Sequence, residues 1–150
     1  MKKIILMSGL FMAIHGIQAQ TTEDSVKAAV NQLFTGMKNA DAAQIQSSFS
    51  DSAILQTIAR TKEGRVVVRN QPLASFVESV AKLPKGAADE RIQFETVKVD
   101  GPMAIAWTPY QFYYNGHFSH CGVNMFQLVR LEGQWRINFL IDTRRKDNCE

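Results

Sequence analysis

The last third of the sequence consists of long alternating runs separated by short turn signals, and this pattern constrains the fold most. Asn115-Gly116 lies between two such runs and is well suited to a two-residue hairpin, because both positions accept positive φ. Glu132-Gly133 and Gly101-Pro102 mark two further reversals. The sequence therefore predicts an antiparallel run of four long strands over residues 91–143.

Amphipathic segments account for most of the chain before this sheet. Apolar side chains recur at helical spacing over residues 22–37, 42–49 and 72–83, and short β-rich segments lie at 53–58 and 65–68. Each predicted helix has one apolar face that must be covered. The sequence therefore predicts the α+β class, with three helices from the N-terminal half packed on a long, curved antiparallel sheet.

The tight turn also predicts the strand register. It pairs His120 with Gln111 and Asn124 with Trp107, and the next turn pairs Asn124 with Ile141. Because side chains alternate along a strand, one continuous apolar face is expected beneath the helices. Its members are Met103, Ile105, Trp107, Phe126, Leu128, Trp135, Ile137, Phe139 and Ile141.

The same face becomes polar toward one end, which predicts a ligand cavity there. The side chains expected at that end are Gln111, His120, Asn124, Thr143 and Arg145. His120 suits a general base or a hydrogen bond to a ligand carbonyl, Gln111 and Asn124 suit a polar ring edge, and Trp107 suits stacking on a flat ligand. A structural His120, bonded to a backbone carbonyl or to Asp142, is the open alternative.

The opposite face of the predicted sheet carries its own apolar side chains. They are Tyr110, Phe112, Cys121, Val123 and Met125, and the register places Asp142 and Arg144 on this face as well. An apolar patch on an outer sheet face predicts a homodimer through that face. Surface hydrophobic residues scattered along long strands are the alternative.

Residues 1–19 have the features of a secretory signal peptide. Lys2 and Lys3 precede an apolar run from Ile4 to Ile14, which is too short to span a membrane, and Ala19 precedes the expected cut. The sequence therefore predicts an exported bacterial protein, periplasmic or secreted, with a single domain over residues 20–150 and no membrane span in the mature chain.

Export permits a disulfide between Cys121 and Cys149, although two separate thiols are equally compatible with the sequence. Two cysteines are too few for a zinc site, and no phosphate-binding or dinucleotide motif is present, so neither metal nor cofactor is expected. Removing Lys2 and Lys3 lowers the net charge from +3 to +1. Such a small charge argues against nucleic acid as a partner.

Several short motifs resemble one known family. They are Ala106-Trp107, Ser119-His120-Cys121-Gly122, the run from Phe126 to Arg130, Trp135-Arg136-Ile137, and Asp142-Thr143-Arg144-Arg145 with Cys149 after it. Together with the order of elements, they resemble the nuclear transport factor 2-like superfamily, in its putative lumazine-binding, SnoaL-like branch. The resemblance implies a cone-shaped fold that encloses a pocket and is commonly dimeric.

The superfamily includes isomerases, dehydratases, epoxide hydrolases and binding modules, so the resemblance leaves the activity open. Ketosteroid-isomerase-like and epoxide-hydrolase-like sites need acids in the pocket, and the predicted register places none on the inward face of the last three strands. We therefore expect an exported protein that binds a small, flat, moderately polar molecule. The alternatives are an enzyme of the same fold with His120 as general base, and a structural homodimer without ligand.

Overall fold

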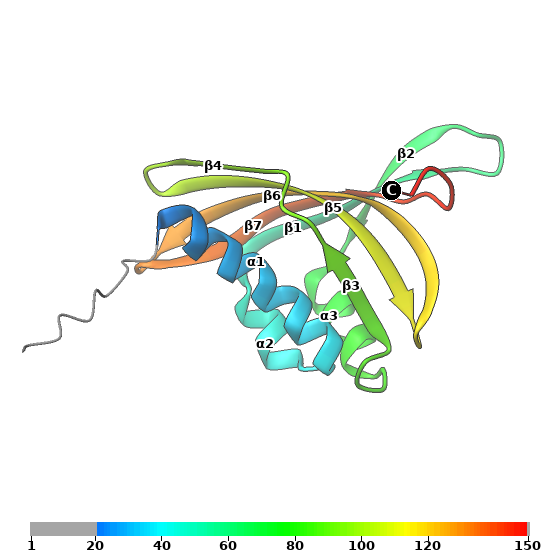
Figure 1. Cartoon of the computed structure of the whole chain (residues 1–150), viewed down its shortest axis with the longest axis horizontal. Coiled ribbons are helices and arrows are strands. Elements are labelled where there is room, and N and C mark those ends of the chain that lie inside the picture. Colours follow the sequence, from blue (N-terminus) through cyan, green and yellow to red (C-terminus); the bar gives the residue numbers. More distant parts are fainter. Residues whose placement is uncertain (1–20, 150) are drawn as a thin grey trace, which may run out of the picture.

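The computed structural model describes residues 21–149, so the predicted signal segment at residues 1–19 lies outside the described part. One seven-stranded sheet curves over three helices, which confirms the expected α+β class (Figure 1). The elements are α1 (Thr22–Asn39), α2 (Ala42–Ser47), β1 (Phe49–Arg60), β2 (Val66–Gln71), α3 (Leu73–Ala81), β3 (Ala88–Ile92), β4 (Thr96–Asp100), β5 (Met103–Tyr114), β6 (His117–Leu131) and β7 (Gln134–Thr143).

The helices begin where side chains can satisfy their first backbone N–H groups. The Thr21 hydroxyl accepts from the Asp24 N–H at the start of α1, and Asp41 accepts from the Gln44 N–H at the start of α2. Helix α1 then packs its apolar side on the sheet, where Phe34 meets Phe126 edge to face with ring centroids 6.1 Å apart.

The strand order is β2-β1-β7-β6-β5-β3, and β4 also pairs with β5. The expected sheet was antiparallel throughout, but β1 runs parallel to β7. Turn signals reveal only strands joined by a short reversal, whereas β1 and β7 are neighbours far apart in the chain. The sheet is therefore mixed, and β1 is longer than the predicted strand at residues 53–58.

A β-bulge in β6 changes the predicted register. The Asn115-Gly116 turn forms as expected, with Tyr114 opposite His117. One extra residue, Ser119, then shifts the pairing, so His120 lies opposite Phe112 instead of Gln111. A slip of one residue reverses every facing, and β5 therefore turns Ala104, Ala106, Thr108, Tyr110 and Phe112 toward the helices. The sequence-based assignment of Met103, Ile105 and Trp107 to the core is wrong, since all three are exposed.

A second bulge has the same effect on β7. Arg130 pairs with Trp135 as predicted, but the register shifts around Asn138, which accepts hydrogen bonds from the Ser50 and Ser52 hydroxyls. Asn124 consequently lies opposite Asp142 rather than Ile141. Beyond the bulge, Leu140 and Asp142 turn inward, which corrects the predicted inward facing of Phe139, Ile141 and Thr143.

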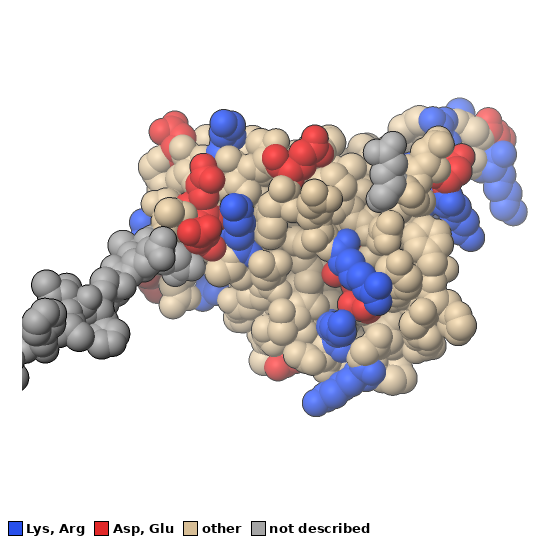
Figure 2. All heavy atoms as spheres, viewed as in Figure 1, with Lys and Arg blue, Asp and Glu red and all other residues tan. Residues whose placement is uncertain are grey.

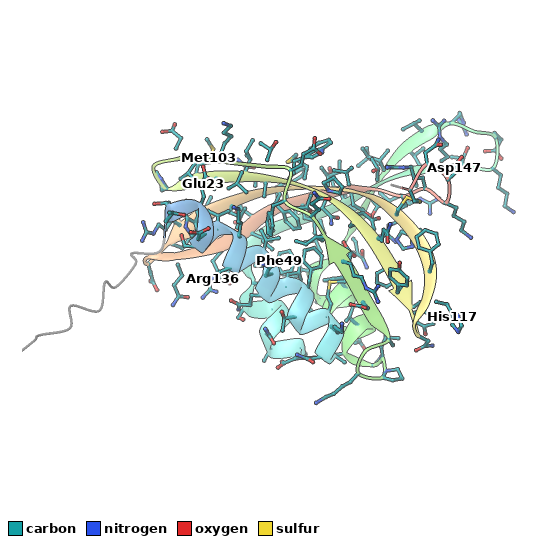
Figure 3. All side chains as sticks on the ribbon, in the orientation of Figure 1. Glu23, Phe49, Met103, His117, Arg136 and Asp147 are labelled. Atoms are coloured by element: carbon teal, nitrogen blue, oxygen red, sulfur yellow. A yellow bond between two sulfur atoms is a disulfide. The ribbon has the colours of Figure 1, made fainter. Side chains whose placement is uncertain are left out.

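The side-chain view agrees with these facings. Met103 stands on the convex side of the sheet, and Phe49 lies on the side of the helices (Figure 3). Phe49 is only 4% exposed, whereas Met103 is 43% exposed. The core therefore lies between the concave face of the sheet and the helices.

A disulfide joins Cys121 in β6 to Cys149, with their Cα atoms 5.8 Å apart. The backbones of Cys121 and Arg145 exchange two hydrogen bonds at 2.8 and 2.9 Å, which continue the sheet past the end of β7. The two cysteines are 28 residues apart in the sequence, and for a loop of this length the chain-entropy model gives a stabilising effect of about 3.5 kcal/mol. The C-terminal segment is thus held against β6.

Gly122, next to the disulfide, lies where two strands approach too closely for any side chain. A Cβ at this position would fall 1.8 Å from the Thr143 carbonyl oxygen and 2.8 Å from the Tyr110 ring. Since Tyr110 lies opposite Gly122 across β5 and β6, its ring takes up the space that the missing side chain leaves.

Replacing Gly122 by alanine should therefore destabilise the fold by at least about 3 kcal/mol, because backbone as well as side chain would have to move. Urea unfolding followed by tryptophan fluorescence measures the change. Gly64→Ala is the control, since a Cβ there meets nothing and only its positive φ of 81° adds a cost, about 1–2 kcal/mol. Equal losses for the two variants would contradict this account of Gly122.

Candidate functional site

A cavity lies between the helices and the concave face of the sheet, and it has two lobes. The β1 lobe holds about 60 Å³ and is lined by Leu33, Phe34, Leu55, Gln56, Thr57, Asn124 and Leu140. The α3 lobe holds about 210 Å³ and is lined by Ser79, Val80, Leu83, Ala88, Tyr110, Phe112 and His120. Both lobes share Met37, Gln71, Phe76, Glu90, Asp142 and Arg144. The lobes therefore meet at a group of ionisable side chains.

Asp142 and Arg144 form an ion pair at this meeting point. Arg144 Nε lies 2.7 Å from Asp142 Oδ2, and the Asp142 side chain is only 11% exposed. Burial by itself would lower the pKa of Arg144, but the neighbouring carboxylate outweighs it and the pKa is raised. The guanidinium of Arg144 is therefore held in its charged form.

Tyr110 joins this pair from β5. Its hydroxyl donates to the Thr143 carbonyl at 2.9 Å and lies 3.3 Å from Asp142 Oδ2. Burial raises the pKa of Tyr110, and the negative charge of Asp142 adds to this shift. The hydroxyl therefore stays protonated and acts as a hydrogen-bond donor.

Glu90 reaches the cavity from β3. Asn124 Nδ2 donates to Glu90 Oε1 at 2.7 Å, a partner that neutralises no charge. Burial raises the pKa of Glu90 from its ordinary 4.5 to about 7, and Asp142 acts in the same direction. At neutral pH this carboxyl is therefore divided between its two protonation states, which suits exchange of a proton with a ligand.

His120 lines the α3 lobe between two aromatic rings. Its ring centroid lies 5.0 Å from that of Phe112 and 5.8 Å from that of Tyr110, and its Nδ1 lies 3.1 Å from the Ser119 hydroxyl. Burial lowers the pKa of His120 below 6.5, and the positive charge of Arg144 acts the same way. The imidazole is thus neutral at neutral pH.

The sequence assigned five side chains to ligand binding, namely Trp107, Gln111, His120, Asn124 and Arg145, and the structure brings only two of them to the cavity. His120 and Asn124 line the cavity. Trp107 pairs with Met125 and is 44% exposed, Gln111 pairs with Cys121, and Arg145 bridges to Cys121, all on the other face. The prediction that these three face inward is wrong, because the two bulges reverse the alternation on which it rested.

Four side chains that line the cavity were not among the site residues predicted from the sequence: Glu90, Tyr110, Asp142 and Arg144. The position of Glu90 could have been predicted, because side chains two residues apart on a strand share a face. Glu90 precedes the apolar Ile92 by two residues, which places it on the inward face. The positions of Asp142 and Arg144 could not, because their facing depends on the bulge at Asn138. The pocket therefore contains Asp142, a carboxylate that the predicted register had placed on the outer face, and Glu90, which lies outside the three strands to which that register applied.

Among residues 21–149, no group of three or more His, Cys, Asp or Glu side chains lies close enough to hold a metal ion. In the same part of the chain, no helix is both long and apolar enough to cross a membrane.

Comparison with known proteins connects this cavity to a family. Residues 21–138, which include the three helices and most of the sheet, match the family described as putative lumazine-binding. The chain belongs to the putative lumazine-binding family. This confirms the resemblance to the nuclear transport factor 2-like superfamily.

Solved structures share the fold of this putative lumazine-binding chain at low sequence identity. A cystatin-like-fold protein of unknown function from Nostoc punctiforme PCC 73102 gives a TM-score of 0.65 at 8% identity, over 85% of this chain and 95% of that one. An NTF2-like protein of unknown function from Shewanella baltica OS155 gives 0.63 at 14%, over 82% and 93%. A ketosteroid isomerase-like protein from Erwinia carotovora atroseptica SCRI1043 gives 0.59 at 13%, over 81% and 95%. No curated protein matches the chain.

The raised pKa of Glu90 predicts how stability depends on pH in this family member. Folding favours the protonated acid, so the unsubstituted protein should lose stability as pH rises from about 4.5 to about 7 and lose no more from this group above that. Glu90→Gln keeps the acceptor for Asn124 without the charge. Its stability relative to the unsubstituted protein should therefore increase through this window.

Urea midpoints of both proteins, measured at half-unit steps from pH 4.5 to pH 8, give this difference directly. Glu95→Gln, at an exposed carboxylate between β3 and β4, is the matched control and should show a constant difference. A constant difference for Glu90→Gln as well would mean that the carboxyl is not perturbed in the folded state.

Proposed function

We propose that this protein is exported and binds a small molecule in the cavity between the helices and the sheet. The observation that carries the proposal is the polar group where the two lobes meet: buried Asn124 and Asp142 and half-buried Glu90, with Arg144 at its exposed side. Buried ionisable groups cost stability, and an apolar filling of the same space would avoid that cost. A binding role gives a reason to retain them.

Export is supported by two independent features. The first 19 residues have the composition of a signal peptide, and Cys121 and Cys149 are joined by a disulfide. Disulfides persist in oxidising compartments such as the periplasm and the extracellular space. The proposed location is therefore periplasmic or extracellular.

The cavity limits the kind of ligand. Lobes of about 210 and 60 Å³ favour a compact, moderately polar molecule over an extended one. Apolar side chains, among them Phe76, Val80 and Phe112, line much of the α3 lobe and would contact the body of the ligand. The polar group at the junction would bind its hydrogen-bonding end.

Native mass spectrometry of the protein purified from its own host tests this function. We expect a small molecule to remain bound to the intact protein, whose mass should lack residues 1–19. Ser79→Trp, which places a bulky ring at the α3 lobe, should abolish retention at nearly unchanged thermal stability.

Ser75→Trp is the matched control, because Ser75 lies exposed on the same helix and lines neither lobe. This variant should retain the ligand. If the unsubstituted protein carries no ligand, or if the two tryptophan variants retain it equally, the binding function fails and the structural homodimer is favoured.

A second candidate, acid–base catalysis, is favoured by one observation. Glu90, with its pKa near 7, shares the α3 lobe with the neutral imidazole of His120 and the hydroxyl of Tyr110. Either Glu90 or His120 can take up a proton there. Chemical conversion of the recovered ligand by fresh protein, lost in Glu90→Gln or His120→Ala, would favour the enzyme over the binding module.

We also propose that two copies associate through the convex face of the sheet. Met103, Ile105 and Trp107 follow one another on this side of β5 and are between 41 and 44% exposed. On the view in Figure 2, Lys and Arg side chains are interspersed with Asp and Glu, and no large region carries one sign alone. An apolar strip on the convex face is therefore the better candidate for a contact between copies.

Trp107→Glu should convert the proposed dimer to a monomer in sedimentation velocity, because it replaces the largest apolar side chain of this strip by a charge. Val66→Glu is the control, since Val66 is 60% exposed on β2 at the far edge of the sheet. A sedimentation coefficient that does not change for Trp107→Glu would exclude this face as the interface.

A further inference from the structure

The two acidic residues that line the cavity, Asp142 and Glu90, differ in whether a basic side chain neutralises their charge. Asp142 has Arg144 as a counter-ion at 2.7 Å, whereas the hydrogen-bond partner of Glu90 is the neutral amide of Asn124 at 2.7 Å. Lys38 and Arg91 both bind Asp89, the residue before Glu90, at 3.0 Å. Among the described residues that line the lobes, Glu90 is thus the acid without a salt-bridge partner of its own.

The groups that face Glu90 come from every element packed around it. Asp142 lies on β7 and Arg144 directly after this strand, Tyr110 lies on β5, and His120 lies on β6. The described side chains that α1 and α3 contribute to the cavity are Leu33, Phe34, Met37, Phe76, Ser79 and Val80, and none of them is ionisable. Helices that carry no charge into the cavity cannot neutralise an ionised Glu90.

We propose that the cavity selects a ligand with a compact apolar body and a protonated amine, and that the amine forms an ion pair with the ionised Glu90 carboxylate. This inference rests on the proposed binding function and names the ligand class for the same site. The apolar body would occupy the α3 lobe, between Phe76 and Phe112, with the amine at the junction of the lobes.

The physical reason is that each charge removes the cost of burying the other. A carboxylate or an ammonium group buried alone is strongly disfavoured, while a well-placed pair with hydrogen bonds is tolerated. A ligand anion would instead meet Asp142 and Glu90 together, and the guanidinium of Arg144 is already engaged by Asp142. The site therefore discriminates by charge as well as by shape.

Binding of this kind releases a proton. The protonated Glu90 carboxyl transfers its proton to solvent, the carboxylate pairs with the ammonium group, and the ammonium group keeps its own protons. Since the free carboxyl has a pKa of about 7, about half a proton per molecule should be released at pH 7. Affinity should rise about tenfold between pH 6 and pH 8, as the ionised fraction of Glu90 rises.

Three probes that share a phenyl ring test the charge preference: benzylamine, benzyl alcohol and benzoate. NMR titrations of the intact disulfide-bonded protein should show benzylamine binding most tightly, with shifts at residues of the α3 lobe. Calorimetry in two buffers of different ionisation enthalpy measures the released proton. Glu90→Gln should lose the preference for benzylamine and the pH dependence, and Glu95→Gln should keep both.

The alternative outcomes separate this inference from the binding function itself. If benzyl alcohol or benzoate binds in the α3 lobe as tightly as benzylamine, the amine preference is overturned while small-molecule binding stands. An unchanged pH dependence in Glu90→Gln would likewise overturn the role of Glu90. If no probe binds although the protein from its host retains a ligand, the amine class is wrong and the cavity function survives.

Discussion

Two extra residues, Ser119 in β6 and Asn138 in β7, determine which side chains the helices cover. Each bulge reverses the facing of the strand beyond it, so the two together turn Tyr110, Asp142 and Arg144 from the convex to the concave side. Without them, Met103, Ile105 and Trp107 would fill the space beneath the helices. The bulges thereby exchange part of a large apolar core for a smaller core with a polar cavity beside it.

The close approach of two strands at Gly122 helps to hold this polar side of the cavity in place. The strand after Asp142 passes so near β6 that only a glycine fits opposite it, and the Tyr110 ring covers the resulting gap and donates to the Thr143 carbonyl. The backbone bonds between Cys121 and Arg145, together with the disulfide to Cys149, fix the segment that carries Arg144. Its guanidinium is therefore held beside Asp142 by the backbone around it as well as by charge.

The sequence predicted the helices and strands well, but it predicted poorly which face of the sheet each side chain lies on. The reason is physical. Helix caps such as Thr21 and Asp41, and the reversal at Asn115-Gly116, are local preferences that tertiary packing rarely overrides. A bulge depends on side chains distant in sequence, as in the bonds from Ser50 and Ser52 to Asn138. His120 and Asn124 lie on the predicted side because no bulge separates them from the core residue Phe126 on the same strand. Trp107 lies on β5, so its facing depended on the pairing of β5 with β6, which the bulge at Ser119 shifts.

Glu90 has no basic partner of its own, although two basic residues lie close to it in the structure. Lys38 and Arg91 both bind Asp89, whose side chain points to the other face of the same strand. The adjacent acid therefore has two counter-ions, while Glu90 has the amide of Asn124 and a pKa raised to about 7 by burial. An acid kept in this condition is poorly suited to stabilising the fold at neutral pH, since its ionised form is destabilising there. It is well suited to meeting a charge that arrives from outside, because a cationic ligand then supplies the counter-ion that the protein leaves out.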